Sequence, residues 1–255
     1  MEELYFSILF FVYGTIFGSF YNVVGDRLPA GKSIISPGSH CPKCKHRLTI
    51  LELIPIFSYI LQGGRCKNCK SRIPVFHLIY EIISGLLFVC CYLKFGFNLS
   101  IIIPLTLVSM LLIIVVSDIE YMVISDEVLI VFGLILFTEM LLINGGTFLV
   151  ESIVNGIISF IIMFGIKICG DFIFKKESMG GGDIKLLFFF GLCLGWENSL
   201  LSIFLGSIVG LPISLIVLST KRTNIIPFGP FLSIGALIIL LTGFDLNALM
   251  SVLLV

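Results

Sequence analysis

The chain has 255 residues, of which 58% are hydrophobic and 13% are charged, and its formal net charge at pH 7 is zero. Its mean hydropathy is +1.13. Soluble domains have about 45–50% apolar and about 25% charged residues. The composition therefore excludes an ordinary soluble domain and indicates a polytopic membrane protein.

Apolar runs long enough to cross a bilayer recur along the chain, since a spanning helix needs about 20 apolar residues. They predict about eight transmembrane helices, at approximately residues 5–24, 78–97, 99–117, 127–143, 148–169, 184–197, 199–218 and 228–243. The first run follows Glu2 and Glu3, where a cleavable signal peptide would carry positive charge, so we expect it to be retained. The sequence thus predicts an all-α polytopic integral membrane protein with a first transmembrane helix (1–25), a loop domain (26–77) and a transmembrane domain (78–255).

The cations are concentrated in loops that follow alternate spans. Nine of the sixteen lysines and arginines fall within residues 26–77, and Lys175, Lys176, Lys221 and Arg222 lie in two later loops of the same parity. Cytoplasmic loops carry an excess of Lys and Arg, so we expect these loops in the cytoplasm and both termini outside it. Membrane orientation already explains the basic charge of the first loop. Because aromatic and basic residues do not alternate there, no nucleic acid partner is expected.

Two CxxC pairs lie in the first loop, in the segments HCPKC (Cys41 and Cys44) and RCKNCK (Cys66 and Cys69). Two thiolates on each of two tight turns can close a four-sulfur site around Zn²⁺. A segment of this size builds little apolar core, so a metal would supply folding energy. A reducing cytoplasm argues against two disulfides. We expect a small zinc-ribbon-like cytoplasmic domain; redox-active or unpaired CxxC turns are the alternative.

Two carboxylates lie at the cytoplasmic ends of predicted spans, where ionisable residues are candidate functional sites. Asp118 ends the third span, in VVSDIEYMVISDEV, and Asp183 begins the sixth, in MGGGDIKLL. The third span runs inward and the sixth outward, so both side chains should lie at one depth. Two carboxylates that share a proton can activate water and polarise a peptide carbonyl, as in an aspartic protease. A metal-binding pair and solvated charges at helix ends are the alternatives.

Helix polarity separates the two carboxylates further. Asp183 lies at a helix start, where the dipole and the free N–H groups favour an anion, and Asp118 lies near a helix end. This predicts that Asp183 holds the charge of the pair and Asp118 the shared proton. Lys185 lies about 200° around the helix from Asp183, so it is not expected to neutralise that carboxylate.

Four segments resemble the prepilin peptidases, also called type IV leader peptidases. They are GSFYNVVGDRLPAGKSIISPGSHCPKC, LIPIFSYILQGGRCKNCKSRIP, MGGGDIKLL and IPFGPFLSIGA. The resemblance implies an aspartic endopeptidase of the GxGD type with Asp118 and Asp183 as the catalytic pair. Asp126 is the rival of Asp118, and Ser125 stands where the family usually has proline. The glycines before Asp183 would let a peptide backbone approach closely.

The resemblance also implies the reaction and its place in the cell. The substrates would be type IV prepilins or pseudopilins of pilus or type II secretion systems, cut after a glycine that precedes a long apolar helix. The enzyme would be a multi-pass protein of the bacterial cytoplasmic (inner) membrane, with its active site facing the cytoplasm. A second activity of the family, N-methylation of the new N-terminus, would use S-adenosyl-L-methionine. No G-x-G-x-x-G fingerprint follows a predicted strand.

Glu81, in the segment HLIYEIISG, is the candidate residue for the methyltransferase site. A structural hydrogen bond from Glu81 to the cysteine loop is the alternative. Three other functions stay open for the chain: a GxGD protease without methyltransferase activity or with other substrates, a non-enzymatic zinc-ribbon membrane assembly factor, and a transporter. Transporters place ionisable groups near the bilayer midplane and often contain internal repeats, whereas these carboxylates fall at one edge and no repeat is evident.

Overall fold

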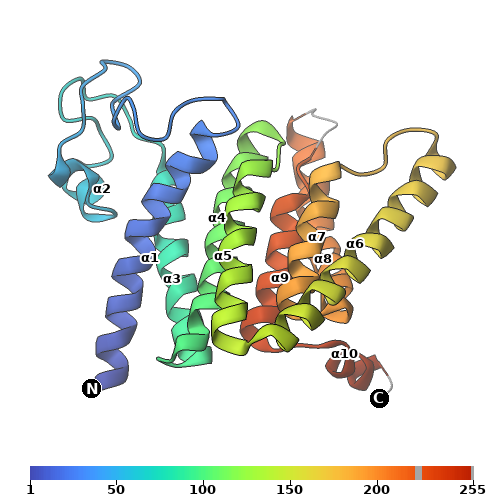
Figure 1. Ribbon diagram of the computed structural model, residues 1–255. Helices are drawn as coiled ribbons and strands as arrows, with labels where there is room; N and C mark the ends of the chain where they lie inside the picture. The colour runs from blue at the N-terminus through green and yellow to red at the C-terminus, as the bar shows by residue number, and fades with distance from the viewer. Residues whose placement is uncertain (222–225, 254–255) are drawn as a thin grey trace. The chain divides into compact units, whose positions relative to one another are not determined.

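The computed structural model describes residues 1–221 and 226–253, so Arg222 lies outside the described residues. Within these ranges the secondary structure is helical, apart from two isolated β-bridges. The prediction of an all-α protein is confirmed (Figure 1). The chain forms two compact units, Met1–Ile101 and Ile102–Val255.

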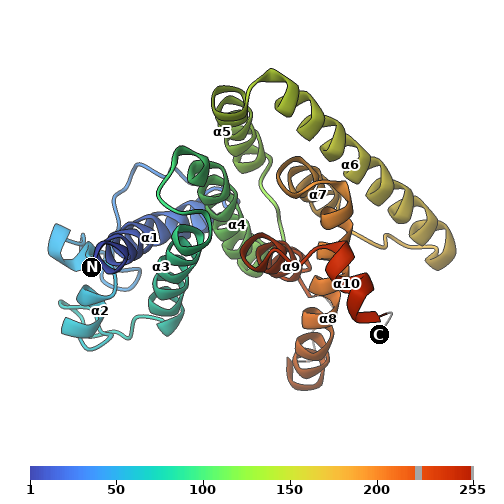
Figure 2. The same cartoon turned by 90° about the horizontal axis from the view of Figure 1, so that it is seen from below.

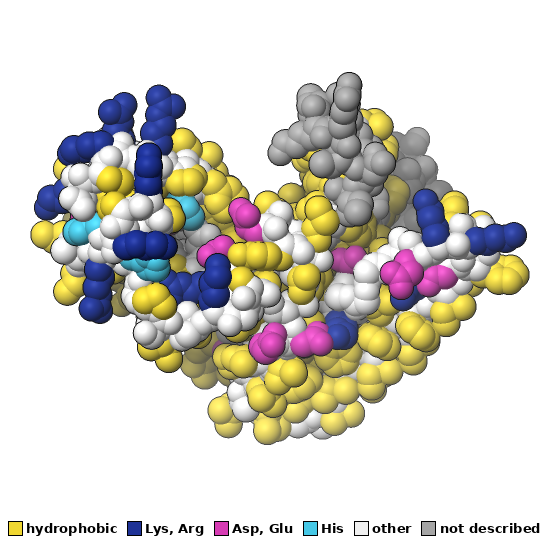
Figure 3. Space-filling model, turned by 90° about the horizontal axis from the view of Figure 1, so that it is seen from above, with side chains coloured by type: hydrophobic (Ala, Val, Ile, Leu, Met, Phe, Trp, Pro, Cys, Tyr) yellow, Lys and Arg dark blue, Asp and Glu magenta, His cyan; other side chains and the backbone are white. Residues whose placement is uncertain are grey.

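The first unit is built on two long helices, α1 (Glu2–Arg27) and α3 (Val75–Phe95). They pack closely because small residues face one another: a Cβ on Gly14 would lie 2.7 Å from the Ser84 carbonyl oxygen. Small residues at such contacts let helix backbones approach within a membrane. The loop between the two helices contains only short helices, η1 (Ile50–Leu53) and α2 (Phe57–Leu61). Figure 3 shows many of the lysine and arginine side chains, together with histidines, gathered over this loop.

The second unit contains seven of the described helices. They are α4 (Ile102–Tyr121), α5 (Asp126–Asn144), α6 (Gly146–Phe174), α7 (Gly181–Leu194), α8 (Trp196–Lys221), α9 (Gly229–Thr242) and α10 (Leu246–Leu253), after the 3-10 turn η2 (Leu99–Ile101). Along the helix axes, α9 lies beside α4, and α7 lies beside α6 and α8 (Figure 2). Small residues again set the close contacts, Gly191 of α7 against Ser159 of α6 and Gly235 of α9 against Ser202 of α8. Most of α4 from Leu107 to Asp118 is buried, so this helix is the core of the unit.

Each of the eight predicted spans coincides with a helix, but the number of spans is not confirmed. Five described stretches are long and apolar enough to cross a membrane: Glu2–Arg27, Val75–Phe95, Leu99–Tyr121, Gly146–Phe174 and Trp196–Val217. Helices α7 and α9 have only 14 residues each. At 1.5 Å per residue they are about 21 Å long, less than the roughly 30 Å of a hydrocarbon core. Composition predicted the apolar runs, but the breaks at glycine set the helix lengths.

Candidate active site

Asp118 lies in the last turn of α4, and only 6% of the residue is exposed. Gly229, the first residue of α9, donates its backbone N–H to Asp118 Oδ2 at 2.9 Å. A Cβ on Gly229 would lie 2.6 Å from the same oxygen. The carboxylate can therefore approach this backbone only because residue 229 has no side chain.

Asp183 is the third residue of α7 and is buried, with 9% exposed. It lies near enough to Asp118 for the two carboxyl groups to interact electrostatically. Ile124, in the turn between α4 and α5, lies next to two glycines: Gly182, which precedes Asp183, and Gly229, which donates to Asp118. A Cβ on Gly182 would lie 2.8 Å from Ile124 Cβ, and one on Gly229 would lie 3.5 Å from Ile124 Cδ1. The structure thus brings together the two aspartates that the sequence singled out, although their positions are far apart in the chain.

The contact with α9 affects the prediction, made from helix polarity, that Asp183 holds the charge and Asp118 the proton. Asp118 does lie at the end of its own helix, but the N-terminus of α9 points an N–H group at its carboxylate. Each aspartate therefore lies beside a helix N-terminus, and the predicted difference between them loses its basis. Sequence reasoning missed Gly229 because 111 residues separate it from Asp118. The signal for Gly229 lies in the segment IPFGPFLSIGA, which is one of the four that resemble the prepilin peptidases.

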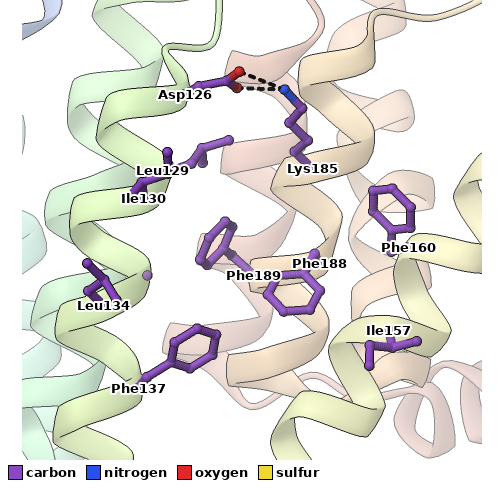
Figure 4. Close-up of a pocket in the computed structure, with 11 residues that line it drawn as sticks. Asp126, Leu129, Ile130, Leu134, Phe137, Ile157, Phe160, Lys185, Phe188 and Phe189 are labelled. Carbon is purple, nitrogen blue, oxygen red and sulfur yellow. Dashed lines mark hydrogen bonds and ion pairs between the residues drawn. The ribbon is translucent and has the colours of Figure 1, made fainter.

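Asp126, the rival candidate, is the first residue of α5 and is held elsewhere. Lys185 Nζ donates to both Asp126 carboxylate oxygens, at 2.7 and 2.9 Å (Figure 4). Both side chains are about half exposed, 48% for Lys185 and 60% for Asp126. As helix geometry predicts, Lys185 does not pair with Asp183. Next to the ion pair is an apolar groove of about 610 Å³, lined by α5, α6 and α7.

The four cysteines form a second centre in the first unit. Their sulfur atoms all lie within 4.8 Å of one another, with 3.8 Å between the Sγ atoms of Cys41 and Cys69 and 3.9 Å between those of Cys44 and Cys66. A tetrahedral site with Zn–S bonds of about 2.3 Å has sulfurs about 3.8 Å apart. The cluster therefore has the donor atoms and the spacing that a tetrahedral metal ion needs.

The two cysteine turns have the same backbone construction. Lys45 and Lys70 each follow the second cysteine of a pair, with positive φ angles of 59° and 58°. Each lysine donates its N–H to the carbonyl of the first cysteine of its pair, at 2.9 Å. An antiparallel bridge closes each turn, His40 with Arg47 and Arg65 with Arg72. Two equivalent turns facing each other give a four-sulfur site with approximate two-fold symmetry.

Backbone and hydroxyl donors prepare part of this cluster for metal binding. The backbone N–H of Cys44 lowers the pKa of the Cys41 thiol to about 6. The Ser71 hydroxyl, 3.1 Å from the Cys69 sulfur, lowers the pKa of that thiol as well. The backbone N–H of His46 acts in the same direction on Cys44, but burial and the other three thiols raise its pKa to about 11. A metal ion would have to displace the proton from Cys44.

Glu81 lies in the second turn of α3, and its carboxylate reaches the cysteine loop. Its Oε2 accepts the backbone N–H of Ile56 at 2.8 Å. Ile56 has a φ of 62°, an unfavourable value for a β-branched residue. Glu81 also shares a hydrogen bond with the Ser19 side chain of α1. The hydrogen bond to this loop that the sequence analysis named as the alternative for Glu81 is present, and the carboxylate connects α1, α3 and the loop.

These features define a class of protein: an all-helical protein with several apolar helices that can span a membrane, two adjacent buried aspartates and a four-cysteine loop. The family comparisons agree with this description. Residues 12–95 match the bacterial peptidase A24 N-terminal domain, and residues 105–215 match the type IV leader peptidase family. The chain belongs to this family, the prepilin peptidases.

Relatives along the whole chain carry the same description. The chain is 32% identical over 240 residues to the prepilin leader peptidase/N-methyltransferase of Bacillus subtilis, which covers 93% of this chain and 94% of the relative. The protein of that name from Aeromonas hydrophila is 29% identical, with 94% and 91% covered. The one from Pseudomonas aeruginosa is also 29% identical, with 95% and 92% covered. No solved structure matches the chain.

Proposed function

We propose that this protein is an aspartic endopeptidase that removes the leader from type IV prepilins or pseudopilins after a glycine, and that it N-methylates the new N-terminal residue. The observation that carries the peptidase proposal is the adjacency of two buried carboxylates, Asp118 and Asp183, contributed by different helices. Family membership and the names of the relatives support the substrate class and the second activity.

In the proposed cleavage the aspartate pair shares one proton. The ionised carboxylate takes a proton from water, whose oxygen attacks the scissile carbonyl, while the other carboxyl group protonates the carbonyl oxygen. Collapse of the tetrahedral intermediate breaks the C–N bond, and the leaving amine takes up the proton that was first removed from water. One hydroxyl group of the intermediate returns its proton to the other aspartate, which restores the shared proton of the pair. The Gly229 N–H fixes the orientation of the Asp118 carboxylate during these proton transfers.

The location proposed for this chemistry is the cytoplasmic face of the bacterial cytoplasmic membrane. A prepilin has a basic leader and an apolar helix, so its leader stays in the cytoplasm while its helix stays in the bilayer. The scissile bond between them then lies at the boundary. Asp118 at the end of α4 and Asp183 at the start of α7 lie at helix termini, which suits a bond at that boundary.

We also propose that the four-cysteine cluster binds a structural Zn²⁺ ion. Four thiolates in tetrahedral spacing leave no open coordination position for catalysis. The metal would connect two turns that have little apolar core of their own, so the ion would contribute to the folding of the loop.

The methylation step follows from ordinary group transfer. The new α-amine attacks the methyl carbon of S-adenosyl-L-methionine, so an N–C bond forms and the S–C bond breaks. The amine loses one proton, and the sulfonium leaves as a neutral thioether, S-adenosylhomocysteine. Glu81 stays the candidate side chain for this activity, acting through the elements that it holds in place.

One experiment tests both activities. Purified protein is incubated with a prepilin and S-adenosyl-L-methionine, and the products are weighed by mass spectrometry. We expect cleavage after the glycine and a mass gain of one methyl group on the mature pilin. Cleavage without the mass gain would support the peptidase proposal and contradict the methyltransferase proposal. An intact prepilin would contradict the peptidase proposal.

A further inference from the structure

The first unit contains a crevice that the peptidase chemistry does not use. It has a volume of about 320 Å³ and lies between the last three turns of α1 and the loop that follows. Its α1 wall is formed by residues at helical spacing, Ser19, Phe20, Val23 and Arg27 among them. This is a different face from the one on which Gly14 and Gly18 pack against α3. The four named α1 residues belong to the motif GSFYNVVGDRLP, for which cleavage supplies no role.

The two matched family regions divide the chain so that the first unit contains neither of the proposed catalytic aspartates. Both aspartates lie within residues 105–215, the part that matches the leader peptidase family. Residues 12–95 match a separate family description and contain neither aspartate. The relatives are named for two activities, peptidase and N-methyltransferase. From these observations and the crevice, we propose that the crevice beside α1 binds the methyl donor, S-adenosyl-L-methionine; the inference rests on the proposed methyltransferase activity.

The lining of the crevice suits this ligand. Small-molecule sites have volumes of about 300–1,000 Å³ and combine mainly apolar walls with a few polar groups. Phe20, 51% exposed, and Ile35, 85% exposed, offer apolar surface to the adenine ring. The Ser39 side of the loop and Ser19 of α1 contribute polar groups. Arg27 offers a guanidinium group to the carboxylate of the methionyl moiety.

The structure also holds these groups in place. Arg27 Nη1 donates to the carbonyl oxygens of Ser33 and Pro37, at 3.1 and 2.8 Å, so the guanidinium is fixed between α1 and the loop. Ser19 is hydrogen bonded to Glu81, and Glu81 also accepts the N–H of Ile56, next to the lining residue Pro55. Glu81 is therefore a positioning residue for two walls of the crevice. Its hydrogen bond to Ser19 places a negative charge one residue away from the crevice lining, and opposite charges attract a cationic sulfonium ligand.

Photolabelling of the unaltered protein tests the location directly. The full-length protein in lipid nanodiscs is irradiated with methyl-tritiated S-adenosyl-L-methionine, digested, and the labelled peptides are identified by mass spectrometry. We expect label within residues 16–39 or 53–55, and excess S-adenosylhomocysteine should suppress it. Label confined to residues 102–221 would overturn the proposal.

Variants give an independent readout, the equilibrium binding of S-adenosyl-L-methionine. Val23→Phe fills the crevice without touching the loop contacts of Arg27, and Arg27→Gln removes the cationic group. We expect each to raise the dissociation constant by about tenfold or more. The matched control is Leu61→Trp, an exposed apolar residue of the same unit that does not line the crevice. Prepilin cleavage in the same samples reports whether each variant is folded, and wild-type binding in folded Val23→Phe would refute the location.

The two proposals can fail separately. Asp118→Asn should bind S-adenosyl-L-methionine like the wild type while cleaving no prepilin. If the wild type methylates pilin but the crevice variants bind the donor normally, only the location is wrong. If the wild type neither binds the donor nor methylates, the methyltransferase proposal fails and this inference fails with it, whereas cleavage remains.

Discussion

At the scale of single residues, Asp118 and Gly229 depend on each other. The 2.9 Å hydrogen bond from the Gly229 N–H fixes one carboxylate oxygen, and the missing side chain at residue 229 makes the approach possible. Asp183 lies in the first turn of α7, where the backbone N–H groups have no partner within the helix itself. Asp118 is thus held by a backbone group at the start of another helix, and Asp183 lies at the start of its own helix.

Substitution of either aspartate should abolish the peptidase. Asp118→Asn and Asp183→Asn each remove a proton-transfer group, so we expect the rate of prepilin cleavage to fall by about 10²–10⁴-fold. The rate is measured with purified protein and a synthetic prepilin in detergent. Asp126→Asn is the matched control, because Asp126 pairs with Lys185, and it should keep most of the activity. A non-enzymatic assembly factor would instead retain its function in both aspartate variants.

Gly229→Ala should damage the site without changing a titratable group. The new methyl group would lie 2.6 Å from Asp118 Oδ2, so the carboxylate or the start of α9 must move. Such overpacking costs about 1–3 kcal/mol, and we expect cleavage to slow substantially. Gly165→Ala is the control, since no atom lies within 4 Å of a Cβ built there. Equal cleavage rates in the two variants would contradict the importance of the Gly229 contact.

At the scale of helices, α1 and α3 are joined by small residues. Because a side chain on Gly14 would meet backbone atoms of Ser84 and Gly85, neither helix can adjust by rotating a side chain. We expect Gly14→Leu to lower the thermal stability of the first unit and Gly165→Leu, on an open part of α6, to leave stability nearly unchanged. Thermal unfolding in detergent measures both. A Gly14→Leu protein as stable as the wild type would show that the two helices are not closely packed.

The ion pair between α5 and α7 should contribute little to stability. Lys185 and Asp126 have good geometry, but both side chains are about half exposed, and exposed pairs contribute about 0.2–1 kcal/mol. A double-mutant cycle with Lys185→Ala and Asp126→Ala, followed by denaturant unfolding, should give a coupling energy in this range. A much larger value would mean that the pair is shielded from water and helps to hold α7 in position.

At the scale of the whole molecule, the two units differ in what stabilises each of them internally. The second unit has a buried helix, α4, at its core, whereas the loop of the first unit has few buried side chains besides Cys41 and Cys66. A metal chelator, or Cys66→Ser, should therefore make residues 26–77 sensitive to protease while the helical circular dichroism of the protein is largely kept. Loss of most of the helical signal on chelation would contradict this separation.

The sequence alone determined the helical class, the apolar runs, the four cysteines and the two aspartates. These features are local or compositional. An apolar run predicts a buried or membrane-spanning helix, and a CxxC segment places two thiolates on one turn. A carboxylate next to an apolar helix is unusual because burying its charge is unfavourable. Ile124 and Gly229 have no such chemical feature of their own: Ile124 is an ordinary apolar residue, and only the resemblance of its segment to a known family marks Gly229. The lengths of the spans could not be predicted either, because they depend on the residues at which the helices end.

Only the tertiary structure decided which of these groups meet. It placed the Gly229 N–H on Asp118, paired Asp126 with Lys185, and joined Glu81 to the backbone of Ile56. Each contact joins positions at least 25 residues apart, and it depends on how helices pack, which no local pattern encodes. The hydrophobic pattern puts a helix in the membrane, but the small residues between helices choose its neighbours, and with them the surroundings of each carboxylate.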